Sequence, residues 1–220
     1  MTPFAVRAYG RASQELAALA FVARHPGELG RVPRWLRERN AATMELRSPW
    51  WPYDAVSWVA AHLPAGARVF EYGGGGSTLW LHDRGAAVTV AEHHAGWHRQ
   101  LAEALPGSVR LLLVPPQSEG SVTSAVEPGF FDDYVAAIDG EPDGSLDLVI
   151  VDGRARVECA RRAMPKVKPG GMLLLDDTER SRYRATVEML AGWGRHVFTG
   201  LKAGHRAPAH TSVWKRPVRG

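Results

Sequence analysis

The sequence has a single cysteine and no long apolar run. With Cys159 alone among 220 residues, no internal disulfide can form, and the helical pattern around it predicts a buried thiol. A bilayer-spanning helix needs about 18 to 20 consecutive apolar residues, and no run of that length occurs. No apolar stretch followed by a small-residue cleavage site indicates a signal peptide. We therefore expect a cytoplasmic protein that does not bind a membrane.

Several common catalytic signatures are also missing. The sequence has no His-Glu-x-x-His or Cys/His zinc spacing and no Gly-x-Ser-x-Gly nucleophile turn. It also has no Gly-x-x-x-x-Gly-Lys-Ser/Thr phosphate loop. These absences argue against a zinc protease, an α/β-hydrolase and a P-loop nucleotidase.

The net charge of +4 comes from the N-terminal segment. Residues 1–47 hold eight arginines and four glutamates, and the rest of the chain holds 19 basic and 19 acidic residues. No lysine–arginine run or basic–aromatic repeat accompanies this excess, so we expect no nucleic-acid partner. A solvated helical surface is the favoured interpretation. The same basic, tryptophan-containing segment is a candidate homodimer surface.

Two zones of different periodicity follow each other along the chain. Residues 1–52 predict a helical extension, with helices at 13–24 and 33–40 and an aromatic, proline-broken turn at 48–52. Residues 53–220 begin with a helix at 53–63 and continue with strands that alternate with helices. The expected strands cover residues 68–72, 87–92, 109–114, 146–152 and 171–176, and the expected helices cover residues 77–84, 95–105, 131–138, 155–165 and 182–192.

This alternation predicts an α/β fold with a Rossmann-like, doubly wound sheet and helices on both faces. The runs that end at Asp152 and Asp176 are almost wholly apolar, which is typical of strands buried on both faces. Two further strands, at 196–201 and 211–215, are joined by a short polar loop and predict an antiparallel hairpin. We therefore expect seven strands, mostly parallel, with an insertion at 115–142 between the third and the fourth.

A glycine-rich turn follows the first strand. Four consecutive glycines, 73–76, lie between Glu71 at the strand end and a helix that begins near Ser77 and Thr78. Glycine permits positive φ and a close approach of ligand to backbone, and a helix N-terminus offers free N–H groups. Nucleotide, flavin and nicotinamide sites all use such turns. The carboxylate of Glu71 would repel a pyrophosphate and suit an amino group, which favours S-adenosylmethionine over a dinucleotide.

Acidic residues end three further strands. Glu92 ends the second strand, 19 residues after Gly73, where doubly wound folds bind ribose hydroxyls. Asp152 ends the fourth strand and is a candidate base, substrate-orienting group or metal ligand. With Asp176 and Asp177 at the end of the fifth, it offers the oxygen ligands that Mg²⁺ prefers. Helix capping or pairing with nearby arginines is the alternative for the last two.

Two histidines, His93 and His94, follow the second strand directly and are expected at the rim of this site. An imidazole there can act as a base near neutral pH. His93 therefore joins Asp152 as a candidate catalytic residue, with a polar surface position as the alternative.

Together these segments resemble the class I S-adenosylmethionine-dependent methyltransferases, from about residue 52 to the C-terminus. Residues 71–78 look like motif I of that superfamily, residues 88–101 like motif II, and residues 146–177 like motif IV and the region after it. The resemblance implies that the cofactor is held by Glu71, Tyr72, Gly73, Gly75, Ser77, Thr78, Glu92, His93 and Asp152.

Within the superfamily, the motifs look like a branch that contains small-molecule and sugar O-methyltransferases. In its metal-dependent relatives, the positions of Asp152, Asp176 and Asp177 hold a metal that lowers the pKa of the acceptor hydroxyl. The spacing of 24 residues between Asp152 and Asp176 is shorter than expected for that group, and two arginines lie nearby. The resemblance thus implies methyl transfer to a small-molecule hydroxyl, with Mg²⁺ as a candidate second cofactor.

The acceptor is expected to contact the least regular segments. Trp51 and Tyr53 come from the aromatic turn and Tyr134 from the insertion, while Arg154 and Arg156 suit an acidic group. Pairing with neighbouring acids is the alternative for the two arginines. Methylation of nitrogen or of a carboxylate, a nicotinamide-dependent oxidoreductase and a non-catalytic cofactor-binding module are the competing interpretations. No Tyr-x-x-x-Lys pair supports the oxidoreductase.

Overall fold

The computed structural model describes residues 3–218, with the side chains of residues 13–218. A seven-stranded sheet forms its centre, with the strand order β3-β2-β1-β4-β5-β7-β6. The strands are β1 (Arg68–Tyr72), β2 (Ala87–Glu92), β3 (Arg110–Leu113), β4 (Leu146–Val151), β5 (Val167–Asp176), β6 (Gly194–Gly200) and β7 (Ala209–Lys215). Strands β1 to β5 are parallel, and β7 runs antiparallel to both β5 and β6. The predicted doubly wound sheet with its C-terminal hairpin is confirmed.

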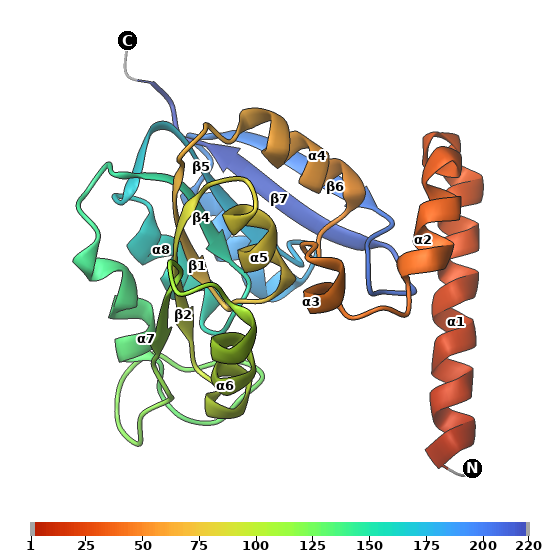
Figure 1. Cartoon of the computed structure of the whole chain (residues 1–220), viewed down its shortest axis with the longest axis horizontal. Helices are drawn as coiled ribbons and strands as arrows, with labels where there is room; N and C mark the ends of the chain where they lie inside the picture. Colours follow the sequence, from red (N-terminus) through yellow and green to blue (C-terminus); the bar gives the residue numbers. More distant parts are fainter. Residues whose placement is uncertain (1–2, 219–220) are drawn as a thin grey trace.

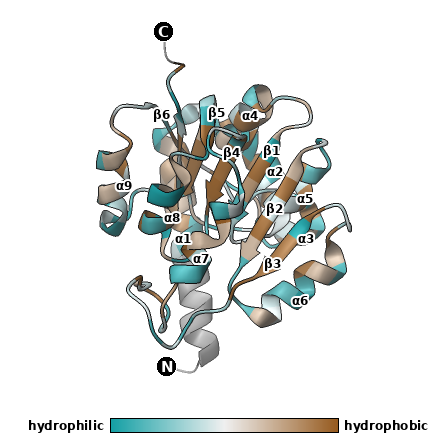
Figure 2. Ribbon diagram, turned by 90° about the vertical axis from the view of Figure 1, so that its left-hand side faces the viewer, coloured by the Kyte–Doolittle hydropathy of each residue, from teal (hydrophilic) through white to brown (hydrophobic). Residues whose placement is uncertain are grey.

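Each central strand has apolar side chains on both faces, and each face has its own core. In β1, Val69 packs with the helices of one side, whereas Phe70 and Tyr72 pack with those of the other. Leu148 and Val149 of β4 divide in the same way, because neighbouring side chains of a strand point to opposite faces. Figure 2 shows these apolar strands between helices that carry hydrophilic outer surfaces. The double burial explains the near-continuous apolar runs.

Six helices and two short 3₁₀ segments cover the two faces. One face carries α4 (Tyr53–His62), α5 (Gly76–His82) and α6 (Ala95–Ala104), and the other carries α7 (Asp132–Ala136), α8 (Arg156–Ala163) and α9 (Arg184–Met189), with η2 (Ala137–Gly140) after α7 and η3 (Ser181–Tyr183) before α9. Every helix expected after residue 53 is present, although those at 131–138 and 182–192 are shorter α-helices joined to 3₁₀ turns. The predicted buried thiol is also confirmed, since Cys159 in α8 is fully buried.

The N-terminal segment is helical and packs beside the C-terminal hairpin (Figure 1). It contains α1 (Pro3–Arg24), η1 (Pro26–Arg31), α2 (Val32–Glu38) and α3 (Thr43–Leu46). Helix α1 begins ten residues before the predicted start at Ser13, so that start was wrong. The side chains of Arg7 and Arg11, which add to the N-terminal charge, lie outside the described residues. None of the helices that the structure describes is long and apolar enough to span a bilayer.

A small core joins this extension to the sheet domain. Trp35 of α2 is buried, and its Nε1 donates to the backbone oxygen of His205 at 2.8 Å. Ala18 and Val22 of α1 and Leu201 from the loop before β7 belong to the same core. The extension therefore supports residues 201–205. The division of the chain at residues 52 and 53 into two domains stays a prediction.

Candidate functional site

A cavity of about 760 Å³ lies at the carboxyl ends of the parallel strands. Strand order reverses between β1 and β4, and open α/β sheets bind their ligands in the crevice at such a point. The volume is within the range of about 300 to 1,000 Å³ that small-molecule sites have. The cavity gathers ten of the predicted site residues, namely Gly73, Gly75, Ser77, Glu92, His93, Asp152, Arg154, Arg156, Asp176 and Asp177.

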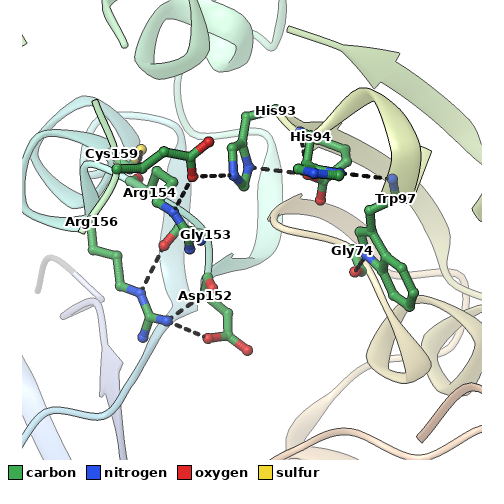
Figure 3. Close-up of polar contacts among 11 residues, drawn as sticks. Gly74, His93, His94, Trp97, Asp152, Gly153, Arg154, Arg156 and Cys159 are labelled. Carbon is green, nitrogen blue, oxygen red and sulfur yellow. Dashed lines mark hydrogen bonds and ion pairs between the residues drawn. The ribbon is translucent and has the colours of Figure 1, made fainter. Parts of the chain in front are cut away.

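The glycine turn brings β1 and β4 into backbone contact. Gly73 has φ +87°, and a Cβ at this position would lie 2.9 Å from the backbone nitrogen and Cα of Gly153. A side chain is therefore excluded at this crossing. The carbonyl of Gly74 accepts a hydrogen bond from Trp97 Nε1 at 2.8 Å, which ties the turn to α6 (Figure 3).

Glu71 lies behind the turn and not on the cavity wall. Its side chain is fully buried and accepts hydrogen bonds from Ser77 Oγ and, at 2.6 Å, from Thr78 Oγ1. Burial raises the pKa of the Glu71 carboxyl to about 8. The expected direct contact between this carboxylate and a ligand amino group does not fit the geometry. Glu71 fixes the turn that faces the cavity.

Tyr72 and Thr78 likewise lie outside the cavity lining. The Tyr72 hydroxyl donates to the backbone oxygen of Val135 at 2.7 Å, on the opposite side of the strand. Thr78 accepts a hydrogen bond from the backbone N–H of Gly75 at 3.0 Å. Both residues support the site from the core, because the strand and helix periods direct them inward.

Glu92 and His93 form the second wall of the cavity, at the end of β2. Glu92 is almost fully buried, and its Oε1 accepts the backbone N–H of His94 at 2.7 Å. His93 Nδ1 is 3.0 Å from the same oxygen, at an angle that does not make a hydrogen bond. His93 Nε2 lies 3.0 Å from an oxygen of Glu127, a residue of the insertion.

Glu127 contacts both His93, after β2, and Arg154, in the turn after β4. The Oε2 atom that contacts His93 also accepts a hydrogen bond from Nε of Arg154 at 2.8 Å. The insertion is thereby fixed to both β2 and the turn after β4. Sequence reasoning missed Glu127, because its partners are 34 and 27 residues away and no local pattern marks it.

The aspartates at the ends of β4 and β5 surround one guanidinium. Arg156 Nη2 is 2.9 Å from Asp152 Oδ1, and Arg156 Nη1 is 3.4 Å from Asp177 Oδ2. Nη1 also donates to the backbone oxygen of Asp176 at 2.8 Å. Burial raises the pKa of Asp152, and that of Asp176 to about 7.

These residues do not fit the predicted Mg²⁺ site. Within the side chains of residues 13–218, no three histidine, cysteine or acidic groups form a metal-binding cluster. The chain turns back through Ala155, at φ +47°, so that Arg156 neutralises Asp152 and Asp177 where the cation was expected. The alternative of pairing between these arginine and aspartate side chains is the one that the structure favours.

The three predicted aromatic contacts lie in the core, and their expected positions in the acceptor site were wrong. Trp51 is 1% exposed and packs edge-to-face against Trp80, with ring centres 6.3 Å apart. The Tyr53 hydroxyl donates to Glu38 at 2.9 Å. Tyr134 is fully buried beneath Gly153. Each side chain is held by contacts with another element, namely α5 for Trp51, α2 for Tyr53 and the turn after β4 for Tyr134.

Trp50, from the aromatic turn assigned to the acceptor, lines the cavity in their place, together with Lys202 and His205, which the sequence did not single out. Trp50 is 46% exposed, Lys202 Nζ lies 4.6 Å from its ring centre, and the His205 ring lies 5.7 Å from it. Lys202 is buried, and its charge is close enough to lower the pKa of Asp152 and Asp176 in opposition to burial. Lys202 and His205 belong to the irregular loop before β7, which shows no periodicity to place them.

Comparison with known proteins supports the architecture. No family model and no curated protein matches the sequence. The structure is similar to a precorrin-6y C5,15-methyltransferase from Geobacter metallireducens, with 15% identity, a TM-score of 0.52 and coverage of 74% of this chain and 86% of that one. It is also similar to a methyltransferase from Pyrococcus furiosus, with 16% identity, a TM-score of 0.51 and coverage of 76% and 83%.

The chain has the class I methyltransferase fold. A third similar structure is a precorrin 8w decarboxylase from Methanobacterium thermoautotrophicum, with 18% identity, a TM-score of 0.53 and coverage of 78% of this chain and 89% of that one. Its name describes a different reaction, so this methyltransferase-like fold does not by itself fix the activity.

Proposed function

We propose that the protein is an S-adenosylmethionine-dependent methyltransferase that acts on a small-molecule hydroxyl. The observation that carries the proposal is one cavity at the switch point of a 3-2-1-4-5-7-6 sheet, walled by the glycine turn and by Glu92. The resemblance of the same residues to methyltransferase motifs adds to it.

The residues fit the cofactor. The side-chain-free stretch from Gly73 to Gly75 leaves backbone partly exposed at the cavity, and Gly75 has nothing within 4 Å of where a Cβ would be. A carboxylate at the end of β2 suits two ribose hydroxyls, and Glu92 is held in place by the backbone of His94. S-adenosylmethionine, when bound, supplies an electrophilic methyl group on a positively charged sulfur.

The protein's own groups supply positioning and a base. Asp152 is held by Arg156 at the carboxyl end of β4, and its raised pKa brings the carboxylate closer to a range in which it can accept a proton from a hydroxyl. His93 remains the second candidate base, although its Nε2 is engaged by Glu127.

Calorimetric titration with S-adenosylmethionine and S-adenosylhomocysteine tests the cofactor assignment. We expect saturable binding by the wild type, about tenfold or greater weakening in Glu92→Ala, and no change in the control Glu103→Ala on the exposed face of α6. Absence of binding to both compounds would remove the proposal. Saturable NADPH binding in its place would favour the oxidoreductase, and cofactor binding without any turnover would favour a binding module.

The catalytic assignment needs a separate variant. Asp152→Asn keeps the shape of the side chain and removes its basicity, so turnover should fall at least about a hundredfold while cofactor affinity stays within about threefold. Mass spectrometry of the methylated product would show whether oxygen, nitrogen or a carboxylate received the methyl group. Wild-type turnover in Asp152→Asn would exclude Asp152 as the base.

A further inference from the structure

A second cavity, of about 430 Å³, lies beside the first. The two share Gly153, Arg154 and Arg156 as a common wall. The remaining wall of the second cavity comes from residues 121–126 of the insertion, from the first turn of α8, and from Arg182 and Tyr183 after β5. The insertion that sequence analysis assigned to acceptor binding therefore encloses a space adjacent to the proposed reaction site.

The lining of this second cavity carries an excess of positive charge. Three arginines, Arg154, Arg156 and Arg182, face a single carboxylate, Glu158, which is itself paired with Arg161 at 3.1 Å. A concave surface lined by guanidinium groups attracts an anion, because the field of their charges is focused there.

Two of the three guanidinium groups have N–H groups without a partner among the described side chains. Arg156 is committed to the aspartates of the first cavity, as described above. Arg154 uses Nε for Glu127, and its two Nη groups make no hydrogen bond within the described side chains. Arg182 pairs with no carboxylate among residues 13–218. Its guanidinium lies 5.2 Å from the ring centre of Tyr183, which steadies it at the cavity edge.

The turn between β4 and α8 separates the two arginines that the cavities share. Ala155 has φ +47°, a conformation that costs a residue with a side chain about 1 kcal/mol or more. With that turn, Arg156 contacts Asp152 while Arg154 contacts Glu127 on the side of the insertion. One short segment thus holds the candidate base on one side and presents free guanidinium donors on the other.

We propose that the second cavity binds the carboxylate or phosphate group of an acidic methyl acceptor. This inference rests on the proposed function, and it narrows the acceptor to a small molecule with a hydroxyl and an anionic group. Arg154 and Arg182 are the groups that bind the anion, since a guanidinium can donate two parallel hydrogen bonds to a carboxylate or phosphate. The hydroxyl then lies across the shared wall, in the cavity that contains Asp152.

Matched probes test the anion site without knowledge of the natural acceptor. Calorimetry on the full chain saturated with S-adenosylhomocysteine would compare 4-hydroxybenzoate and 4-hydroxyphenyl phosphate with neutral 4-hydroxybenzamide. We expect at least one acid to bind about tenfold tighter than the amide. Arg182→Gln should remove this preference and leave amide binding unchanged. The control Arg184→Gln, an exposed arginine outside both cavity linings, should keep it.

The outcomes separate this inference from the cofactor assignment. Equal affinity for acids and amide, no binding of either class at millimolar concentration, or an unchanged preference in Arg182→Gln would overturn the anion site. If S-adenosylhomocysteine itself does not bind, the proposed function fails. Acid binding that is weakened by Arg182→Gln in that case would keep the anion site but refute its role in methyl transfer.

Discussion

The buried carboxyl of Glu71 makes the stability of the protein depend on pH in a direction opposite to that of most acidic residues. Its pKa is raised from 4.5 to about 8, chiefly because no water reaches it. The folded state therefore holds a proton that the unfolded chain has already released between these values. The stabilisation from this group is complete below pH 4.5 and is lost as the pH rises through about 8.

The size of the effect follows from the two pKa values. Each tenfold difference in proton affinity corresponds to about 1.4 kcal/mol, so the full span is about 5 kcal/mol in the free energy of unfolding. Glu71→Gln keeps the shape and replaces the neutral acid by an amide, which can still accept from one of the two hydroxyls of Ser77 and Thr78. We expect it to be within about 1 kcal/mol of the wild type at pH 5.

Urea denaturation of both proteins between pH 5 and 9 is the assay. The wild type should lose stability relative to Glu71→Gln across this range, by about 4 kcal/mol, because part of the full span is already lost at pH 5. Asp152 and Asp176 also have raised pKa values, but both proteins contain them, so the difference between the two curves isolates Glu71. Parallel curves would refute the reasoning, because they would mean that the Glu71 carboxyl is ionised throughout.

Three further substitutions examine the walls of the site. Gly73→Ala should lower the free energy of unfolding by more than about 1 kcal/mol and abolish cofactor binding, whereas Gly75→Ala, with open space at its Cβ, should unfold like the wild type in a thermal melt. Arg156→Met should lower the free energy of unfolding by at most about 3 kcal/mol in urea denaturation, because it removes the ion pair of Asp152 and leaves Asp177 paired with Arg180 alone. The exposed pair of Arg161 with Glu158 on the same helix should contribute less than about 1 kcal/mol, so Arg161→Met is its control. Glu127→Gln should release the insertion from His93 and Arg154, and amide hydrogen exchange of residues 117–131 should become about tenfold faster while that of the sheet stays constant.

The sheet could be predicted because its signals are local. Strands buried on both faces leave unbroken apolar runs, and an acid at the end of each run marks where the chain emerges from the core. The glycine turn is equally local, since β1, the turn and α5 are continuous in the chain. The C-terminal hairpin followed from the absence of a helix between its strands. The helix ends were less certain, because 3₁₀ turns and α-helical turns share the same apolar spacing.

Side-chain direction at the site could not be predicted in the same way. Position in the chain placed Glu71, Trp51 and Tyr134 beside the site, yet all three side chains point into the core. Neighbouring residues can point in opposite directions: the side chain of Trp50 is 46% exposed, whereas that of Trp51 is 1% exposed. The packing of Trp51 on Trp80 of α5, and of Trp50 on Lys202 and His205, determines which of the two rings faces the cavity.

The proposed cofactor side of the site comes from a short continuous segment, whereas the proposed acceptor side comes from segments far apart in the chain. The cofactor half is a continuous turn plus one strand end, so its residue types and spacing suffice to suggest a ligand. The acceptor half is assembled from the insertion, the turn after β4, the segment after β5 and the loop before β7. Its contacts, such as that between Glu127 and Arg154, join residues with no fixed spacing. Under the proposed function, specificity for the acceptor depends on tertiary contacts, and substitutions such as Arg182→Gln should change the choice of acceptor without changing the affinity for the cofactor.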